Sequence, residues 1–136
     1  MADTVRKIIN QEKYYILPLS GLVLEKFIFY QPNGQNMIVL ELEKEDYHAG
    51  FTLEVFDLYD LHGNIMSNLD KYINSLQGET CINALVLKTG TLEIKFEKHK
   101  FLVNPDPNYE SWSFWDSNDI KIYCLAGGEL MTFGIR

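Results

Sequence analysis

The segment Asp57–Gly63 holds the residues whose types and spacing come nearest to catalytic chemistry. Asp57 and Asp60 lie shortly before His62. A carboxylate beside an imidazole can transfer a proton as a general acid or base. Such catalysis requires side chains that converge on one point, which spacing along the chain does not guarantee. An enzyme built on these three residues is therefore the third of three hypotheses, and side chains that point apart would exclude it.

The other residue types that do chemistry lie apart from one another. His48 and His99 fall in expected turns, and neither has a second His or a Cys at a metal-ligand spacing. Cys81 and Cys124 lie in apolar segments without flanking positive charge, which is typical of buried free thiols. The chain has no nucleophile elbow and no glycine-rich phosphate loop. We therefore expect no catalytic residue, no metal and no cofactor, and a protein that is not an enzyme.

Binding is a better use for the acidic and aromatic residues. Carboxylates gather in the middle of the chain, and Trp115 stands beside Asp116 in an aromatic segment. An acidic patch complements a basic protein, and tryptophan is enriched among the side chains that dominate binding energy. The alternatives are a solvated strand edge for the carboxylates and a core position for at least one of Trp112 and Trp115. The residues expected to bind a partner are Glu41, Glu43, Glu45, Asp46, Glu54, Asp57, Asp60, Trp115 and Asp116.

The charge of the chain restricts the kind of partner. The 136 residues carry a net charge of −7, with an isoelectric point near 4.9. Nucleic acids and anionic membranes both attract lysine-rich and arginine-rich surfaces, so neither is expected as a partner. A basic protein is the partner that this charge suits. No apolar run is long enough for a signal peptide or a membrane span, which favours the cytoplasm.

Strands, rather than helices, are expected to position these residues. Apolar and polar side chains alternate in short segments separated by turn residues, which is the pattern of half-buried strands. One short helix is expected at about 66–77, where apolar residues recur at helical spacing. The expected strands are 14–17, 22–30, 37–42, 51–55, 81–87, 91–96, 101–103, 109–115, 120–125 and 130–133.

The order of these strands indicates a weak internal repeat. In both 19–55 and 76–103, a strand, a glycine-containing turn and a second strand are followed by a third strand that begins with phenylalanine. The expected fold class is mainly β: an antiparallel β-sandwich or a partly closed barrel, built from two similar three-stranded meanders plus a C-terminal hairpin. Residues 1–136 suit a single β-domain, in which residues 1–13 form a flexible arm or a short helix.

Three segments of the C-terminal third follow sequence patterns that occur together in other proteins. They are Gly90–Phe96, with the pattern G-x-L-x-I-x-F, Pro105–Trp112, with P-D-P-x-Y-E-x-W, and Gly127–Leu130, with G-G-E-L. These segments resemble a family of small bacterial β-domains of unassigned function. Its members resemble, and often occur among, the immunity proteins of polymorphic and contact-dependent toxin systems. The resemblance supplies no catalytic residue. We interpret Tyr109, Glu110 and Trp112 as structural, because a turn fixed by proline leads here into a strand whose aromatic side chains are expected to pack in the core.

The resemblance implies an immunity protein that binds a cognate bacterial toxin and occludes its active site. A basic nuclease-type toxin domain is the partner that we expect. The acidic segment around residues 41–46, which is longer than the family pattern, is where we expect partner choice to be made. The alternative is a non-catalytic module in which a β-barrel encloses a small apolar ligand. That alternative requires a cavity lined by Phe27, Phe29, Phe51 and Leu53, and a filled interior would count against it.

Overall fold

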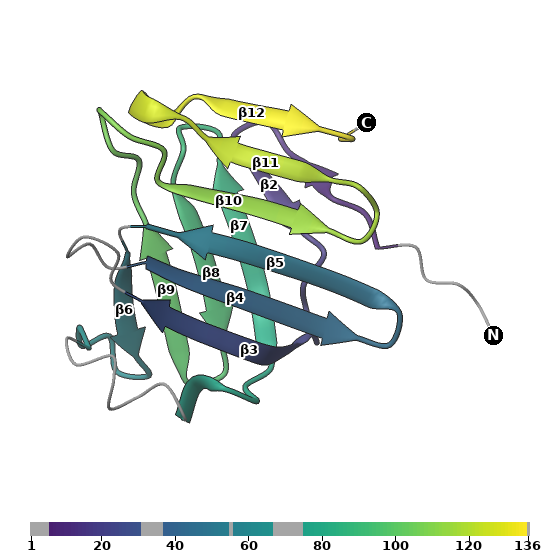
Figure 1. Ribbon diagram of the computed structural model, residues 1–136, viewed down its shortest axis with the longest axis vertical. Coiled ribbons are helices and arrows are strands. Elements are labelled where there is room, and N and C mark those ends of the chain that lie inside the picture. Colours follow the sequence, from purple (N-terminus) through teal and green to yellow (C-terminus); the bar gives the residue numbers. More distant parts are fainter. Residues whose placement is uncertain (1–5, 31–36, 55, 67–74, 136) are drawn as a thin grey trace.

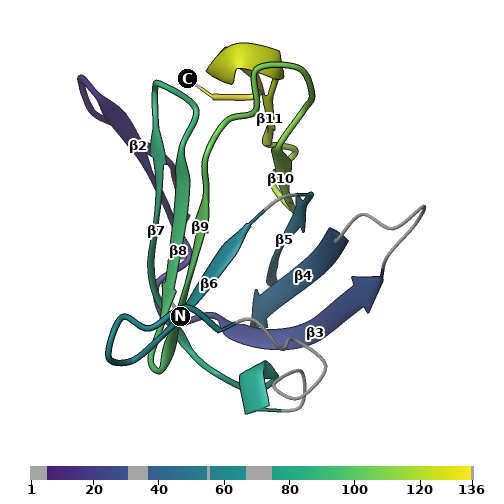
Figure 2. The same ribbon diagram turned by 90° about the vertical axis from the view of Figure 1, so that its left-hand side faces the viewer.

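Two antiparallel sheets form the protein, which we describe from a computed structural model that covers residues 6–30, 37–54, 56–66 and 75–135. The sheets stack as a sandwich and do not close into a barrel (Figures 1 and 2). Sheet A has the spatial order β1 (Ile9–Asn10), β2 (Tyr14–Leu17), β7 (Cys81–Leu87), β8 (Leu92–Phe96), β9 (His99–Val103), β6 (Asp57–Asp60). Sheet B has the order β12 (Leu130–Phe133), β11 (Lys121–Cys124), β10 (Trp112–Asp116), β5 (Tyr47–Leu53), β4 (Met37–Lys44), β3 (Val23–Tyr30).

The two predicted meanders are present, one in each sheet. Strands β3, β4 and β5 are neighbours in sheet B, and β7, β8 and β9 are neighbours in sheet A. The predicted C-terminal hairpin, β10 and β11, joins sheet B beside β5, and the 3-10 turn η2 (Ala126–Gly128) leads from it to β12. The predicted sandwich is confirmed and the partly closed barrel is not. The helix predicted at about 66–77 falls mainly on residues 67–74, which lie outside the described residues.

Strict alternation along the strands builds the core between the sheets. In β4, for example, Ile38, Leu40 and Leu42 are buried while the residues between them face solvent. Phe51 and Leu53, which were expected to line a ligand cavity, are fully buried and belong to the same core cluster. The structure therefore gives the ligand-binding barrel no support.

The N-terminal segment is attached to the sandwich from Arg6 onward. Strand β1 pairs with β2, and the Arg6 guanidinium donates hydrogen bonds to the carbonyl oxygens of Pro18 (2.9 Å) and Ser20 (3.2 Å). The same guanidinium lies 5.5 Å from the centre of the Tyr47 ring. Residues 6–10 are thus tied to both sheets, whereas residues 1–5 lie outside the described part of the chain.

The two sheets are joined at one end, where the turn after β7 meets the turn before β12. The indole N–H of Trp112 donates to the carbonyl oxygen of Gly90 across this junction, at 2.9 Å. A β-carbon at Gly90 would lie 2.6 Å from the Cα of Gly128, and one at Gly128 would lie 2.3 Å from the oxygen of Thr89. The backbones can approach this closely only because both positions are glycine.

The three segments of the sequence resemblance meet at this junction. Gly90, Trp112 and Gly128 come from one segment each. The backbone oxygen of Asp106 accepts a hydrogen bond from Gly127, at 2.8 Å, which holds the proline-containing segment against η2. The predicted core position is confirmed for Trp112, which is buried. It is wrong for Tyr109, which is 66% exposed because the loop turns it away from the core.

Replacing Gly128 with alanine should destabilise the protein far more than replacing Gly127. Both glycines have positive φ, 99° at Gly128 and 84° at Gly127. An alanine in this left-handed conformation lowers the free energy of unfolding by about 1–2 kcal/mol in either variant. Only at Gly128 does the added carbon meet backbone, since nothing lies within 4 Å of a β-carbon at Gly127. We expect G128A to lose at least about 2 kcal/mol more than G127A in urea unfolding. Equal losses would show that the junction is not tightly packed.

Candidate functional site

The solvent-facing side of sheet B, here called the sheet B outer face, brings together part of the predicted partner-binding set. The strand register places Glu41, Gly50 and Trp115 directly opposite one another on β4, β5 and β10. The same row continues to Lys121 on β11 and Phe133 on β12. Glu43 lies one step along β4 on the same face. Residues far apart in the sequence therefore share one surface.

Trp115 lies against the backbone of Gly50. A β-carbon at Gly50 would be 2.4 Å from the indole Nε1 and 2.5 Å from Cε2, so the ring occupies the space that a side chain would fill. The residue remains 38% exposed. A ring that is already held in place loses little conformational freedom when a partner covers it. Trp115 therefore has the properties of a binding anchor.

Carboxylates flank this tryptophan on β4. Glu41 lies 3.8 Å from the ammonium of Lys26, and Glu43 lies 3.0 Å from Nδ1 of His48. All four side chains are largely exposed, and exposed ion pairs contribute only about 0–1 kcal/mol each. Both carboxylates can consequently exchange these neighbours for the cations of a partner at little cost.

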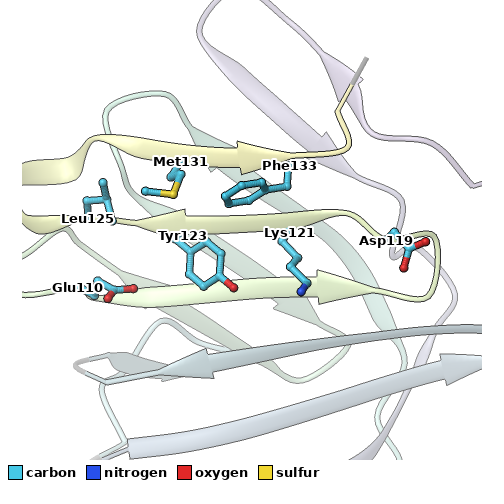
Figure 3. Close-up of a pocket in the computed structure, with 7 residues that line it drawn as sticks. All are labelled: Glu110, Asp119, Lys121, Tyr123, Leu125, Met131 and Phe133. Atoms are coloured by element: carbon cyan, nitrogen blue, oxygen red, sulfur yellow. The ribbon is translucent and has the colours of Figure 1, made fainter.

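A surface pocket of about 490 Å³ lies beside Trp115, over β11 and β12. The rings of Tyr123 and Phe133 meet edge to face within it, 6.1 Å apart. Figure 3 shows Glu110 and Asp119 at opposite ends of the pocket, with the apolar side chains between them. Its lining consists of Glu110, Asp119, Lys121, Tyr123, Leu125, Met131 and Phe133.

The remaining predicted carboxylates do not join one patch. Glu45 and Asp46 form the exposed turn between β4 and β5, at one end of sheet B. Glu54 follows β5, where burial and the negative charge of Glu110 raise the pKa of its carboxyl group. Glu54 therefore lies close enough to Glu110, at one end of the pocket, for the two negative charges to interact.

Asp116 is buried, at 6% exposure, and its carboxylate serves the fold. It accepts hydrogen bonds from the Tyr47 hydroxyl at 2.7 Å and from the backbone N–H groups of Asn118 (2.9 Å) and Ile120 (3.1 Å). Burial, followed by the bond to Asp116, raises the pKa of Tyr47. These contacts tie the β10–β11 turn to β5, and they leave little of Asp116 for a partner to contact.

Asp57, Asp60 and His62 do not form a catalytic group. Asp57 and Asp60 are three positions apart on β6 in sheet A, so their side chains leave the strand on opposite sides. Asp60 Oδ1 accepts the backbone N–H groups of His62 and Asn64, both at 2.9 Å. The bond from Asn64 is the largest cause of the lowered pKa of Asp60. Asp60 shapes a turn, and the hypothesis of an enzyme at this segment is not supported.

Both thiols are buried, and the possible metal ligands in the described part of the chain are not grouped. Cys81 and Cys124 are free and buried, as predicted, and burial raises the pKa of the Cys81 thiol to about 12. Among residues 6–30, 37–54, 56–66 and 75–135, no three His, Cys, Asp or Glu side chains are grouped so as to hold a metal ion.

Sequence reasoning missed several residues of the sheet B outer face. A glycine inside a strand often marks the close approach of another group, but the expected strand began at residue 51 and left Gly50 outside it, whereas β5 begins at Tyr47. No sequence signal identified the other residues of this face, because alternation within a strand does not say which side of a sheet faces solvent. These residues are Lys121, Tyr123, Met131 and Phe133.

Comparison with known proteins places most of this architecture in one family. Residues 38–134, which run from β4 through β12, match the family described as "Family of unknown function (DUF6188)". No curated protein and no solved structure matches the chain. In the described part of the structure, no helix has the length and apolar character needed to cross a membrane.

Replacing Gly50 with alanine should displace the Trp115 ring from its position against the β5 backbone. The new methyl group would overlap the indole, whose Nε1 is 2.4 Å from that position. We expect the indole N–H resonance of Trp115 to shift and its fluorescence quenching by acrylamide to increase, while buried Trp112 is unaffected. Gly63→Ala is the control, because nothing lies within 4 Å of a β-carbon there. An unchanged Trp115 signal in G50A would contradict this description of the site.

Proposed function

We propose that this chain, which belongs to the DUF6188 family of unknown function, is an immunity protein that binds a cognate bacterial toxin domain and blocks its active site. The proposal depends mainly on the position of Trp115. Its ring lies against the backbone of Gly50, remains partly exposed, and shares the sheet B outer face with the carboxylates of β4. The resemblance of the C-terminal segments to domains found among immunity proteins supplies the class of partner. The binding surface is the sheet B outer face.

The apolar content of this face supports a protein partner. Three side chains around the pocket and its neighbouring row are well exposed: Trp115 at 38%, Met131 at 42% and Phe133 at 49%. Exposed apolar groups gathered on one face and rimmed by polar residues mark protein interfaces. A central aromatic anchor with a charged rim is the arrangement that concentrates binding energy.

The net charge of the chain favours a basic toxin. On the sheet B outer face, Glu41 and Glu43 lie beside the exposed Trp115 row and are available to the cations of such a partner. A toxin that acts on nucleic acid must carry basic surface to neutralise phosphates. The net charge of −7 would attract such a domain and raise its association rate. An inhibitor that covers this basic surface also blocks the approach of the substrate.

The variant Trp115→Ala tests whether the toxin docks on this face. The probe is the variable C-terminal domain of a secreted protein encoded beside this chain, purified with its activity intact. We expect W115A to weaken binding at least about 30-fold in calorimetry, which corresponds to the roughly 2 kcal/mol of a hot spot. Leu87→Ala, at a residue 39% exposed on sheet A, is the matched control and should bind normally. If W115A and L87A bind the toxin domain with equal affinity, the interface lies elsewhere. If the chain neutralises no toxin domain of this kind, the proposed function is wrong.

The association rate should fall as salt rises. Electrostatic steering by the carboxylates of β4 operates over a Debye length, which shrinks from about 30 Å at 0.01 M to about 3 Å at 1 M salt. We expect a decrease of about tenfold or more across this range in stopped-flow measurements, and a smaller one for a Glu41→Gln and Glu43→Gln double variant. A rate that is constant in salt would remove steering from the mechanism.

A further inference from the structure

The free edges of the two sheets differ in how they are protected. Four strands lie at sheet edges: β1 and β6 in sheet A, and β3 and β12 in sheet B. An edge strand exposes backbone N–H and C=O groups that can pair with another chain, and proteins usually cover, charge, bend or shorten such strands. Each of the edges β6, β3 and β1 has one of these protections over at least part of its length.

The edge of β6 is covered by the turn that follows it. The N–H of Met66 donates to the carbonyl oxygen of Leu58 at 2.8 Å, and the N–H of Asp60 donates to that of Asn64 at 2.9 Å. Backbone groups of β6 that point away from β9 are thereby paired within the chain.

The edges of β3 and β1 are protected in other ways. Leu24 on β3 exchanges backbone hydrogen bonds with Gly78 (2.8 Å) and Glu79 (2.9 Å), and a bulge interrupts the strand between Leu24 and Lys26. Strand β1 is only two residues long. Beyond the bulge β3 keeps an unbroken register with β4 from Lys26 to Tyr30, and the charge of Lys26 stands at the start of that run.

Strand β12 has none of these protections. Its sequence, Leu130–Phe133, contains no charged residue and no proline, and its register with β11 is uninterrupted. Three of its four residues are exposed: Met131, Thr132 and Phe133. In the described structure, no backbone hydrogen bond from outside the sheet reaches Leu130 or Thr132.

The phase of the β11–β12 ladder identifies the free groups. The N–H of Leu125 donates to the oxygen of Glu129 at 2.8 Å, which makes that pair a hydrogen-bonded one. Hydrogen-bonded pairs recur at every second residue of an antiparallel ladder, so Met131 and Phe133 bond to β11. The N–H and C=O groups of Leu130 and Thr132 therefore point away from the sheet.

We propose that β12 accepts an extended, basic strand of the toxin, which adds to the edge of sheet B. This inference rests on the proposed function for the identity of the partner. Main-chain hydrogen bonds to Leu130 and Thr132 would supply affinity, and alternate apolar side chains of the added strand would pack beside Met131 and Phe133. The added strand would be continuous with the Trp115 anchor, because Trp115, Lys121 and Phe133 form one cross-strand row.

Charge favours a basic strand over a second copy of this chain. Glu110 and Asp119 stand at the two ends of the pocket beside β12, and the pKa of Glu54 is raised in part by the charge of Glu110. A lysine or arginine at this corner would relieve that repulsion. Two copies of the chain would instead bring together two bodies with a net charge of −7 each.

A synthetic peptide tests strand addition without the toxin. The probe is a capped hexapeptide of alternating lysine and valine, titrated into the isotope-labelled chain and followed by NMR. We expect amide shifts at Leu130–Phe133 and Tyr123. The expected Kd is about 1 mM, which corresponds to a binding free energy of about 4 kcal/mol. The same peptide with N-methyl groups on its pairing edge, and one with glutamate in place of lysine, should bind at least tenfold more weakly.

The variant Thr132→Pro removes one outward N–H from the edge. Proline is tolerated where an edge-strand N–H faces solvent, so the β11–β12 ladder should remain intact. We expect T132P to lose the peptide shifts and to weaken toxin binding at least tenfold, while the matched Thr132→Ala retains both. If T132P does not fold, the N-methylated peptide supplies the same comparison with the unaltered protein.

The outcomes separate this inference from the proposed function. Peptide shifts that are absent from β12, or that N-methylation leaves unchanged, overturn strand addition. Toxin binding that depends on Trp115 but not on Thr132 supports the immunity function and rejects the strand. Peptide binding at β12 without any toxin binding supports the open edge and rejects the immunity function.

Discussion

The hydrogen bond from the Trp112 indole to the Gly90 carbonyl is the contact on which the arrangement of the two sheets depends. It lies in the buried interior, where an unpaired N–H would cost about 1–3 kcal/mol. Trp112 belongs to sheet B and Gly90 to a turn of sheet A, so the bond fixes one sheet against the other. The contact of Gly90 with Gly128 adds a steric requirement at the same point. Together they determine where β11 and β12 lie relative to the core, and so where the pocket and the open edge are presented.

The proposed binding surface combines a rigid part, Trp115, with a strand edge, β12, that is open to pairing. Trp115 is held on Gly50, and the turn beside it is fastened by the carboxylate of Asp116. Strand β12 lies two strands away from Trp115 and pairs with a neighbouring strand, β11, on one side only. A preformed anchor limits the entropy lost on association, and an open edge supplies directional hydrogen bonds that tolerate many side-chain sequences. This combination would let one scaffold serve partners that differ in sequence but share an extended segment.

Local patterns predicted the strands and meanders, whereas contacts between distant strands decided the rest. Alternation and glycine turns are properties of short segments, so the order of β3–β5 and β7–β9 could be read directly. Whether the sheets close into a barrel depends on how their edges meet, which no short segment encodes. The same limit applies to the predicted acidic residues. Glu41 and Trp115 share a face because β4, β5 and β10 pair in one register, while Asp57 lies in the other sheet.

Burial was the other property that residue type did not reveal. Asp116 was predicted to meet a partner because it is acidic and follows Trp115, but Tyr47 and two backbone amides occupy its carboxylate. Tyr109 shows the opposite case, an aromatic residue of a structural segment that faces solvent. In both cases the deciding factor is which loop covers the residue, and loops are placed by tertiary contacts.

The pairing of β5 with β10 also determines when the surface comes into existence. These neighbours in sheet B come from opposite halves of the chain, and β6 to β9, which belong to sheet A, lie between them in sequence. Pairings between distant segments form late because the intervening chain must first be brought together. As the polypeptide leaves the ribosome, β5 has to wait for β10 with one side unpaired. A fragment released before β10 is synthesised would lack Trp115 itself, so the proposed binding surface forms only when the chain has been translated nearly to its end.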